Sequence, residues 1–179
     1  AMTSASTAHR AANSPPTPVT HRSTARRIAG YAGWELLRNV RMVESTFFIV
    51  VLPTVLYIMF GALSSWGDGE AGHGNVSAYN MTAMAVYGAT MATSAIAGSA
   101  AIERQQGWGR QLGLTGLGGS GYMVGKILVA LGIALLPIVV IFVVGALTGA
   151  RFDEGWMWPA SGGLALLGAF PFALYGLAA

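Results

Sequence analysis

The sequence predicts an all-α, polytopic membrane protein with four transmembrane helices. Hydrophobic residues make up 54% of the 179 positions and charged residues only 9%, whereas a soluble domain carries about 25% charged residues. Four segments are long and apolar enough to cross roughly 30 Å of hydrocarbon, which takes about 20 residues of helix. Each must be helical, because an isolated strand leaves its backbone polar groups unsatisfied in lipid.

The N-terminal segment differs from the rest of the chain in composition. Residues 1–26 are mainly Ala, Ser, Thr and Pro with scattered His and Arg, and they show no apolar periodicity. This composition is typical of a disordered tail. We therefore assign the transmembrane domain to residues 27–179.

Residues 27–43, "RIAGYAGWELLRNVRMV", are too polar to cross the membrane. They mix apolar side chains such as Trp34 and Leu37 with Arg38 and Arg41. Two interpretations stay open. The segment is either a helix lying on the cytoplasmic surface of the membrane, which we take as the expectation, or a short lead-in whose arginines set the topology.

The predicted spans occupy residues 45–64, 80–102, 123–149 and 160–179. The N-terminal segment holds six Lys and Arg residues, the 65–79 loop none, the 103–122 loop with the adjoining Lys126 three, and the 150–159 loop one. By the positive-inside rule, the N-terminus and the 103–122 loop are cytoplasmic. We expect a multi-pass protein of the plasma (inner) membrane, with Lys126 as an anchor at the cytoplasmic interface.

The predicted second span has two distinct faces. At helical spacing, one side carries Asn80, Tyr87, Met91 and Ser94. This face either lines a pathway for an amphipathic substrate, since methionine and aromatic side chains adapt to varied shapes, or packs against another helix. The opposite side predicts close helix packing, because small residues recur at every fourth position: Ala85, Ala89, Thr93, Ala97 and Ala101.

Motifs for catalysis are weak. The stretch "GGSGYMVGKI" resembles the phosphate loop G-x-x-x-x-G-K-[ST], but Ser120 replaces the first glycine and Ile127 replaces the final Ser or Thr. No span contains a central Asp, Glu, His or Arg, which argues against proton-coupled transport and intramembrane hydrolysis. We therefore predict a chain that is not an enzyme and holds no cofactor or metal of its own.

Three segments, in order, resemble the type-2 ABC transporter permeases. Residues around Arg38, Arg41 and Pro53 are similar to the surface helix and first span of that family, and "GAFPFALYGL" resembles its fourth span. Gly116 stands where the family usually has proline. The 103–122 segment resembles the family's cytoplasmic loop through Glu103, Arg104, Gly107, Arg110, Leu112, Thr115, Leu117, Tyr122 and Lys126.

The resemblance implies the transmembrane subunit of an ATP-binding-cassette exporter for a drug, antibiotic or lipid-like compound. The 103–122 loop would dock a separate ATPase subunit, which binds ATP and Mg²⁺, and a second permease copy would complete the pathway in the lipid bilayer. No nucleic-acid partner is expected. The family has six spans, so we expect a truncated permease. A non-transporting membrane scaffold and a small proton-coupled multidrug transporter stay open as alternatives.

Overall fold

The structure is a bundle of helices. The computed structural model describes residues 24–107 and 118–178. Residues 1–23 of the predicted disordered tail therefore lie outside the described residues. The elements are α2 (Thr24–Arg41), α3 (Val43–Tyr57), the π-helix η1 (Ile58–Ala62), α4 (Val76–Gln105), α6 (Gly118–Leu147) and α7 (Met157–Ala178). The described residues contain only two isolated β-bridges besides helices and turns, which confirms the all-α prediction.

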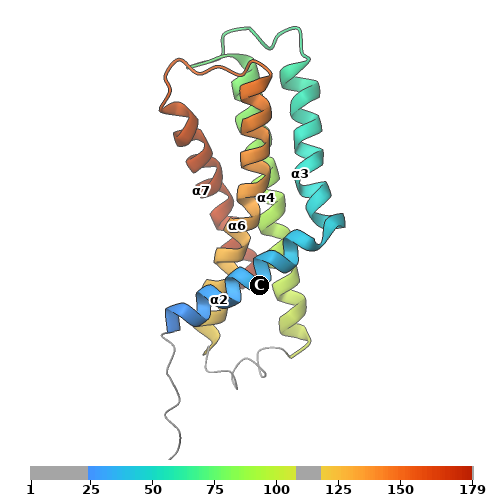
Figure 1. Ribbon diagram of the computed structural model, residues 1–179, viewed down its shortest axis with the longest axis vertical. Helices are drawn as coiled ribbons and strands as arrows, with labels where there is room; N and C mark the ends of the chain where they lie inside the picture. Colours follow the sequence, from blue (N-terminus) through green and yellow to red (C-terminus); the bar gives the residue numbers. More distant parts are fainter. Residues whose placement is uncertain (1–23, 108–117, 179) are drawn as a thin grey trace, which may run out of the picture.

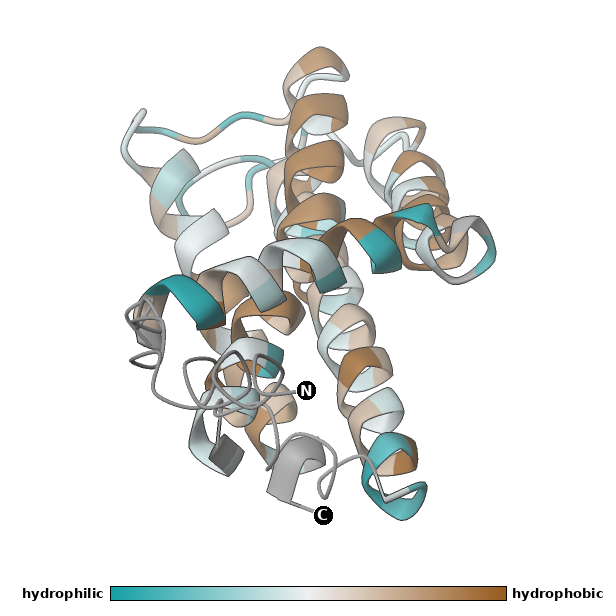
Figure 2. Cartoon of the chain, turned by 60° about the horizontal axis from the view of Figure 1, so that its bottom comes forward, coloured by the Kyte–Doolittle hydropathy of each residue, from teal (hydrophilic) through white to brown (hydrophobic). Residues whose placement is uncertain are grey.

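Helices α3, α4, α6 and α7 run along the long axis of the molecule, and α2 crosses them at one end (Figure 1). We call this end the α2 end, and the opposite end, where the connections 63–75 and 148–156 lie, the loop end. Helix α4 packs against α6, α7 and α3. The lengthwise helices are mostly apolar, whereas α2 carries strongly hydrophilic residues among apolar ones (Figure 2).

Three helices are long and apolar enough to cross a membrane: Val76–Gln105, Gly119–Leu147 and Met157–Tyr175. They correspond to three of the four predicted spans. The length and apolar composition of these helices indicate a membrane-embedded protein. The predicted span 45–64 corresponds to α3 and η1, which meet α2 at a bend of 66°. This bent pair qualifies only when both parts are counted together, so the fourth span and the interfacial position of α2 stay predictions.

Small side chains let the lengthwise helices approach closely. Of the predicted ladder on α4, Ala85, Ala89, Thr93 and Ala97 are buried, while Ala101 is partly exposed. Lipid tails are as apolar as leucine, so helices in a bilayer associate through tight van der Waals contact rather than hydrophobic burial. The buried ladder therefore supplies the contact surface that α4 needs at the centre of the bundle.

Three helices meet at Gly88. The rings of Pro53 from α3 and Pro137 from α6 are both fully buried, and both lie against this glycine of α4. A Cβ atom at Gly88 would lie 2.7 Å from Cβ of Pro137 and 3.1 Å from Cγ of Pro53. Because proline rings cannot rotate away, only glycine fits at this crossing.

Hydrogen bonds join the two connections at the loop end. Oδ1 of Asn75 accepts from the backbone N–H of Ala78 at 3.0 Å, which caps α4, and from that of Arg151 at 2.9 Å. Its Nδ2 donates to the carbonyl of Gly149 at 2.8 Å. The buried hydroxyl of Tyr57 lies 2.8 Å from that of Thr148. The loop end is therefore held by specific polar contacts that join α3, the start of α4 and the 148–156 connection.

We expect Gly88→Ala to destabilise the bundle, because the added methyl group overlaps two rigid rings. Overpacking of this kind costs about 1–3 kcal/mol, which lowers Tm by roughly 2–4 °C per kcal/mol in a chain of this size. Thermal unfolding in a mild detergent measures the effect. Gly98→Ala is the matched control, since no atom beyond its chain neighbours and the adjacent backbone of its own helix lies within 4 Å of its Cβ position. Equal Tm values for the two variants would contradict the proposed crossing.

Candidate functional site: a buried charge cluster

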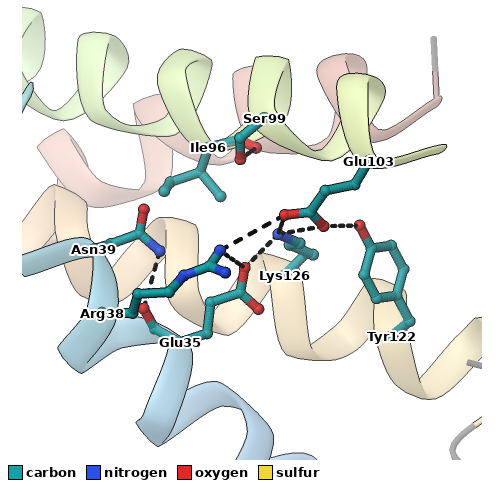
Figure 3. Close-up of polar contacts among 8 residues, drawn as sticks. All are labelled: Glu35, Arg38, Asn39, Ile96, Ser99, Glu103, Tyr122 and Lys126. Atoms are coloured by element: carbon teal, nitrogen blue, oxygen red, sulfur yellow. Dashed lines mark hydrogen bonds and ion pairs between the residues drawn. The ribbon is translucent and has the colours of Figure 1, made fainter. Parts of the chain in front are cut away.

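Lys126, near the start of α6, is fully buried at the α2 end of the bundle. Its Nζ donates to the carboxylate of Glu35 from α2. It also donates to the carboxylate of Glu103 from α4 at 2.9 Å. One ammonium group therefore joins three helices (Figure 3).

Two further side chains complete the charge cluster, which we define as Glu35, Arg38, Glu103, Tyr122 and Lys126. Arg38 Nη2 lies 3.6 Å from Glu35 and 3.7 Å from Glu103, and its side chain is 46% exposed. The Tyr122 hydroxyl donates to Glu103 at 2.8 Å. Two carboxylates thus face two cations, so the cluster is formally neutral.

Glycines of α6 allow α2 to come close enough for these contacts. A Cβ atom at Gly125 would lie 2.7 Å from the ring of Tyr31, and one at Gly132 would lie 2.8 Å from Cδ1 of Leu36. Both partners belong to α2, on either side of Glu35 in sequence. The "GK" pair that resembles a phosphate loop therefore has a structural role, because Gly125 admits Tyr31 and Lys126 pairs with two carboxylates.

The electrostatics of the cluster depend on burial. Oε2 of Glu35 is buried and has no hydrogen-bond partner among the described residues. Burial also raises the pKa of Tyr31, and the adjacent Glu35 carboxylate adds to this shift through hydrogen bonding and its negative charge. Removing charges from water costs several kcal/mol per ion, and only close, well-satisfied pairing offsets that cost.

The predicted coupling residues are only partly described. Glu103 belongs to the charge cluster, and Arg104 lies beside it in the last turn of α4, 3.3 Å from Sδ of Met123. Gly107 follows the end of α4 with a φ of 78°, a conformation that favours glycine. Four of the predicted coupling residues lie outside the described residues: Arg110, Leu112, Thr115 and Leu117.

Lys126, predicted as an interface anchor, is fully buried and paired with two carboxylates, and its place at the membrane interface stays a prediction. Glu35 was not predicted as a site residue, because it belongs to a segment predicted to lie on the membrane surface. One signal was present in the sequence. Tyr31, Glu35 and Asn39 recur at four-residue spacing and form a polar stripe on α2, which is partly or fully buried.

The predicted pathway face of α4 lies opposite the buried ladder. Tyr87 and Ser94 are exposed, and Met91 is partly buried. Asn80 donates to the carbonyl of Phe60 at 3.1 Å, which links α4 to η1. The face is thus accessible at its middle in this single chain. Lining of a pathway and packing against a second chain both stay predictions.

No protein-family model, curated protein or solved structure matches this chain. The likeness to type-2 ABC permeases therefore rests on the sequence segments alone. Within residues 24–107 and 118–178, no group of three or more His, Asp or Glu side chains is placed to hold a metal ion.

We expect Lys126→Met to lower Tm strongly, because it leaves the buried carboxylate of Glu35 and the partly buried carboxylate of Glu103 without their shared cation. Breaking one partner of a buried ion pair typically costs about 3–5 kcal/mol. The double variant Glu35→Gln/Lys126→Met should lose less stability than the sum of the two single variants, since the groups are coupled. Thermal unfolding in detergent measures all three. Glu44→Gln, at an exposed carboxylate near the start of α3, is the control, and a Lys126→Met variant as stable as this control would refute the pairing.

Proposed function

We propose that this chain is the membrane subunit of an ATP-driven exporter, coupled to a separate ATPase through the 103–122 segment. One observation supports this proposal above the others. The charge cluster joins both ends of that segment to α2, because Glu103 is its first residue and Lys126 follows it, while Glu35 and Arg38 belong to α2. A cytoplasmic partner that moves the segment would therefore move α2 as well.

The chemistry of the cluster suits this transmission. Attraction between charges in a low-dielectric interior is strong but depends on short distances. Helix α2 must accordingly follow a shift of the adjoining ends of α4 and α6, or leave Lys126 unpaired. Because α3 begins two residues after α2 ends, the shift would continue into the helices of the membrane domain.

The remaining parts of the exporter are partners of this chain. ATP and Mg²⁺ would be bound by the ATPase subunit, and a second permease copy in the bilayer would face this one. The accessible face of α4 around Tyr87 is the proposed lining of the pathway. An amphipathic drug, antibiotic or lipid-like molecule fits such a face, since it presents methionine and aromatic side chains without a charge.

Docking of the ATPase can be tested by cross-linking, because the chain contains no cysteine. We expect a single Leu112→Cys variant, cross-linked in native membranes, to form an adduct with a protein that carries nucleotide-binding motifs. Adding Arg110→Glu should lower the adduct yield several-fold. His73→Cys is the matched control, since this exposed residue lies at the loop end. An adduct of equal yield from both sites, or none from Leu112→Cys, would refute the docking role.

One observation favours the proton-coupled alternative. The sequence alone disfavours it because no span has a central carboxylate, yet the structure buries Glu35 with one unpartnered oxygen. Proton coupling needs a carboxylate in the protein interior. Inside-out vesicles from cells that express the full reading frame can distinguish ATP-driven from proton-driven transport. Ethidium uptake driven by ATP supports the exporter, uptake driven by an imposed pH gradient supports the alternative, and no uptake under either condition supports a scaffold.

A further inference from the structure

The loop end contains a cavity that the proposed coupling does not use. It has a volume of about 320 Å³ and lies between the first turns of α4, the first turns of α7 and the two connections of the loop end. This volume falls within the range of small-molecule sites. The cavity is open to the surface, so a ligand could reach it without unfolding the loops.

Three aromatic side chains, Tyr79, Phe152 and Trp156, contribute to the walls of this cavity. Tyr79 is 67% exposed and Trp156 is 62% exposed, so neither ring is covered by its own chain. Phe152 packs against Trp158, whose ring centre lies 5.3 Å away in an edge-to-face arrangement. Exposed aromatic faces attract cations through the negative charge density above the ring.

The surrounding charges have the sign that complements a cation. The loop-end connections carry four acidic side chains, Asp68, Glu70, Asp153 and Glu154, against the single Arg151. Two of the acids contact lining residues. Asp153 Oδ2 lies 3.9 Å from Nδ1 of His73, and Glu154 accepts from Nε1 of Trp156.

A competing effect comes from the two helix N-termini beside the cavity. Each N-terminus carries the equivalent of about half a positive charge, so α4 and α7 together contribute about one unit. The four carboxylates and one arginine together carry a net charge of −3. The acidic side chains therefore outweigh the helix ends, and the local field still favours a cation over an anion.

The cavity is also formed in advance of binding. Asn75 joins the two connections through its side chain, and Gly74 pairs with Phe152 in an isolated bridge. A Cβ atom at Gly74 would lie 2.5 Å from the carbonyl oxygen of Arg151, so the loops are closely apposed. Walls that are already ordered reduce the entropy lost on binding.

We infer that this cavity, lined by Tyr79, Phe152 and Trp156, is a binding site for a lipophilic organic cation. The aromatic walls take up the apolar groups of the ligand, and Asp153 and Glu154 stabilise its charge. The site belongs to the chain itself and lies at the opposite end from the charge cluster. The inference is therefore independent of the proposed ATPase partner.

Tetraphenylphosphonium and tetraphenylborate form a matched pair of probes, since they share size and shape and differ in the sign of their charge. Equilibrium dialysis with the purified chain in an uncharged maltoside detergent, corrected with empty micelles, measures the binding of each probe. We expect saturable binding of tetraphenylphosphonium at about one site per chain, and no saturable binding of tetraphenylborate. Equal binding of both probes would overturn the inference, because the cavity would then select only for apolar surface.

Variants test whether the probe occupies this cavity. We expect Trp156→Ala to weaken tetraphenylphosphonium binding by about tenfold, through loss of an aromatic face. Trp66→Ala is the control, because Trp66 lies at the same end, is 77% exposed and does not line the cavity. Equal losses in both variants would show nonspecific adsorption to interfacial tryptophans and would refute the site.

The charge contribution has its own pair of variants. Asp153→Asn/Glu154→Gln should weaken binding several-fold, whereas Asp68→Asn/Glu70→Gln, which removes the same charge from the other connection, should weaken it less. A larger loss in the second pair would place the cation elsewhere.

Tm in detergent verifies folding, and Ala160→Trp provides a second means of blocking the cavity, because it adds bulk to the wall formed by α7. Full binding by this blocked variant would also refute the site.

Discussion

The position of one ammonium group constrains the α2 end of this protein. Lys126 is fully buried, and an unpaired charge in an apolar interior is prohibitively costly. Its two carboxylate partners come from α2 and α4. If either helix moved away from α6, the buried ammonium group would lose one of its partners. The register of α6 and the docking of α2 therefore depend on each other. Gly125 and Gly132 permit this arrangement, because larger residues would meet Tyr31 and Leu36.

Different physical forces hold the middle and the two ends of the bundle. The middle relies on van der Waals contact between small residues and two proline rings around Gly88. The loop end relies on hydrogen bonds of Asn75 and Tyr57. The α2 end relies on charge. This division separates the two proposed activities, since a partner acting on the charge cluster and a cation in the loop-end cavity contact different residues at opposite ends.

Local sequence properties account for the elements that were predicted well. A run of about 20 apolar residues specifies a membrane helix without reference to its neighbours, so the helices within 80–102, 123–149 and 160–179 are visible in the sequence. The small-residue ladder of α4 is equally visible, because helical periodicity places its members on one side. The segment 45–64 is harder to assign. Its helix is predicted, but its status as a span depends on the bend to α2 and on a membrane boundary that no local pattern sets.

The sequence by itself determined the helical class, the approximate helix positions and the presence of a lysine at the start of the third predicted span. Only the tertiary structure decided what that lysine does. Glu35 and Lys126 are separated by 91 positions, and burial of a charge depends on which helices meet rather than on the residues beside it. The loop-end cavity has the same origin, because Tyr79 and Trp156 come from segments that are distant in sequence and become neighbours only after the bundle has formed.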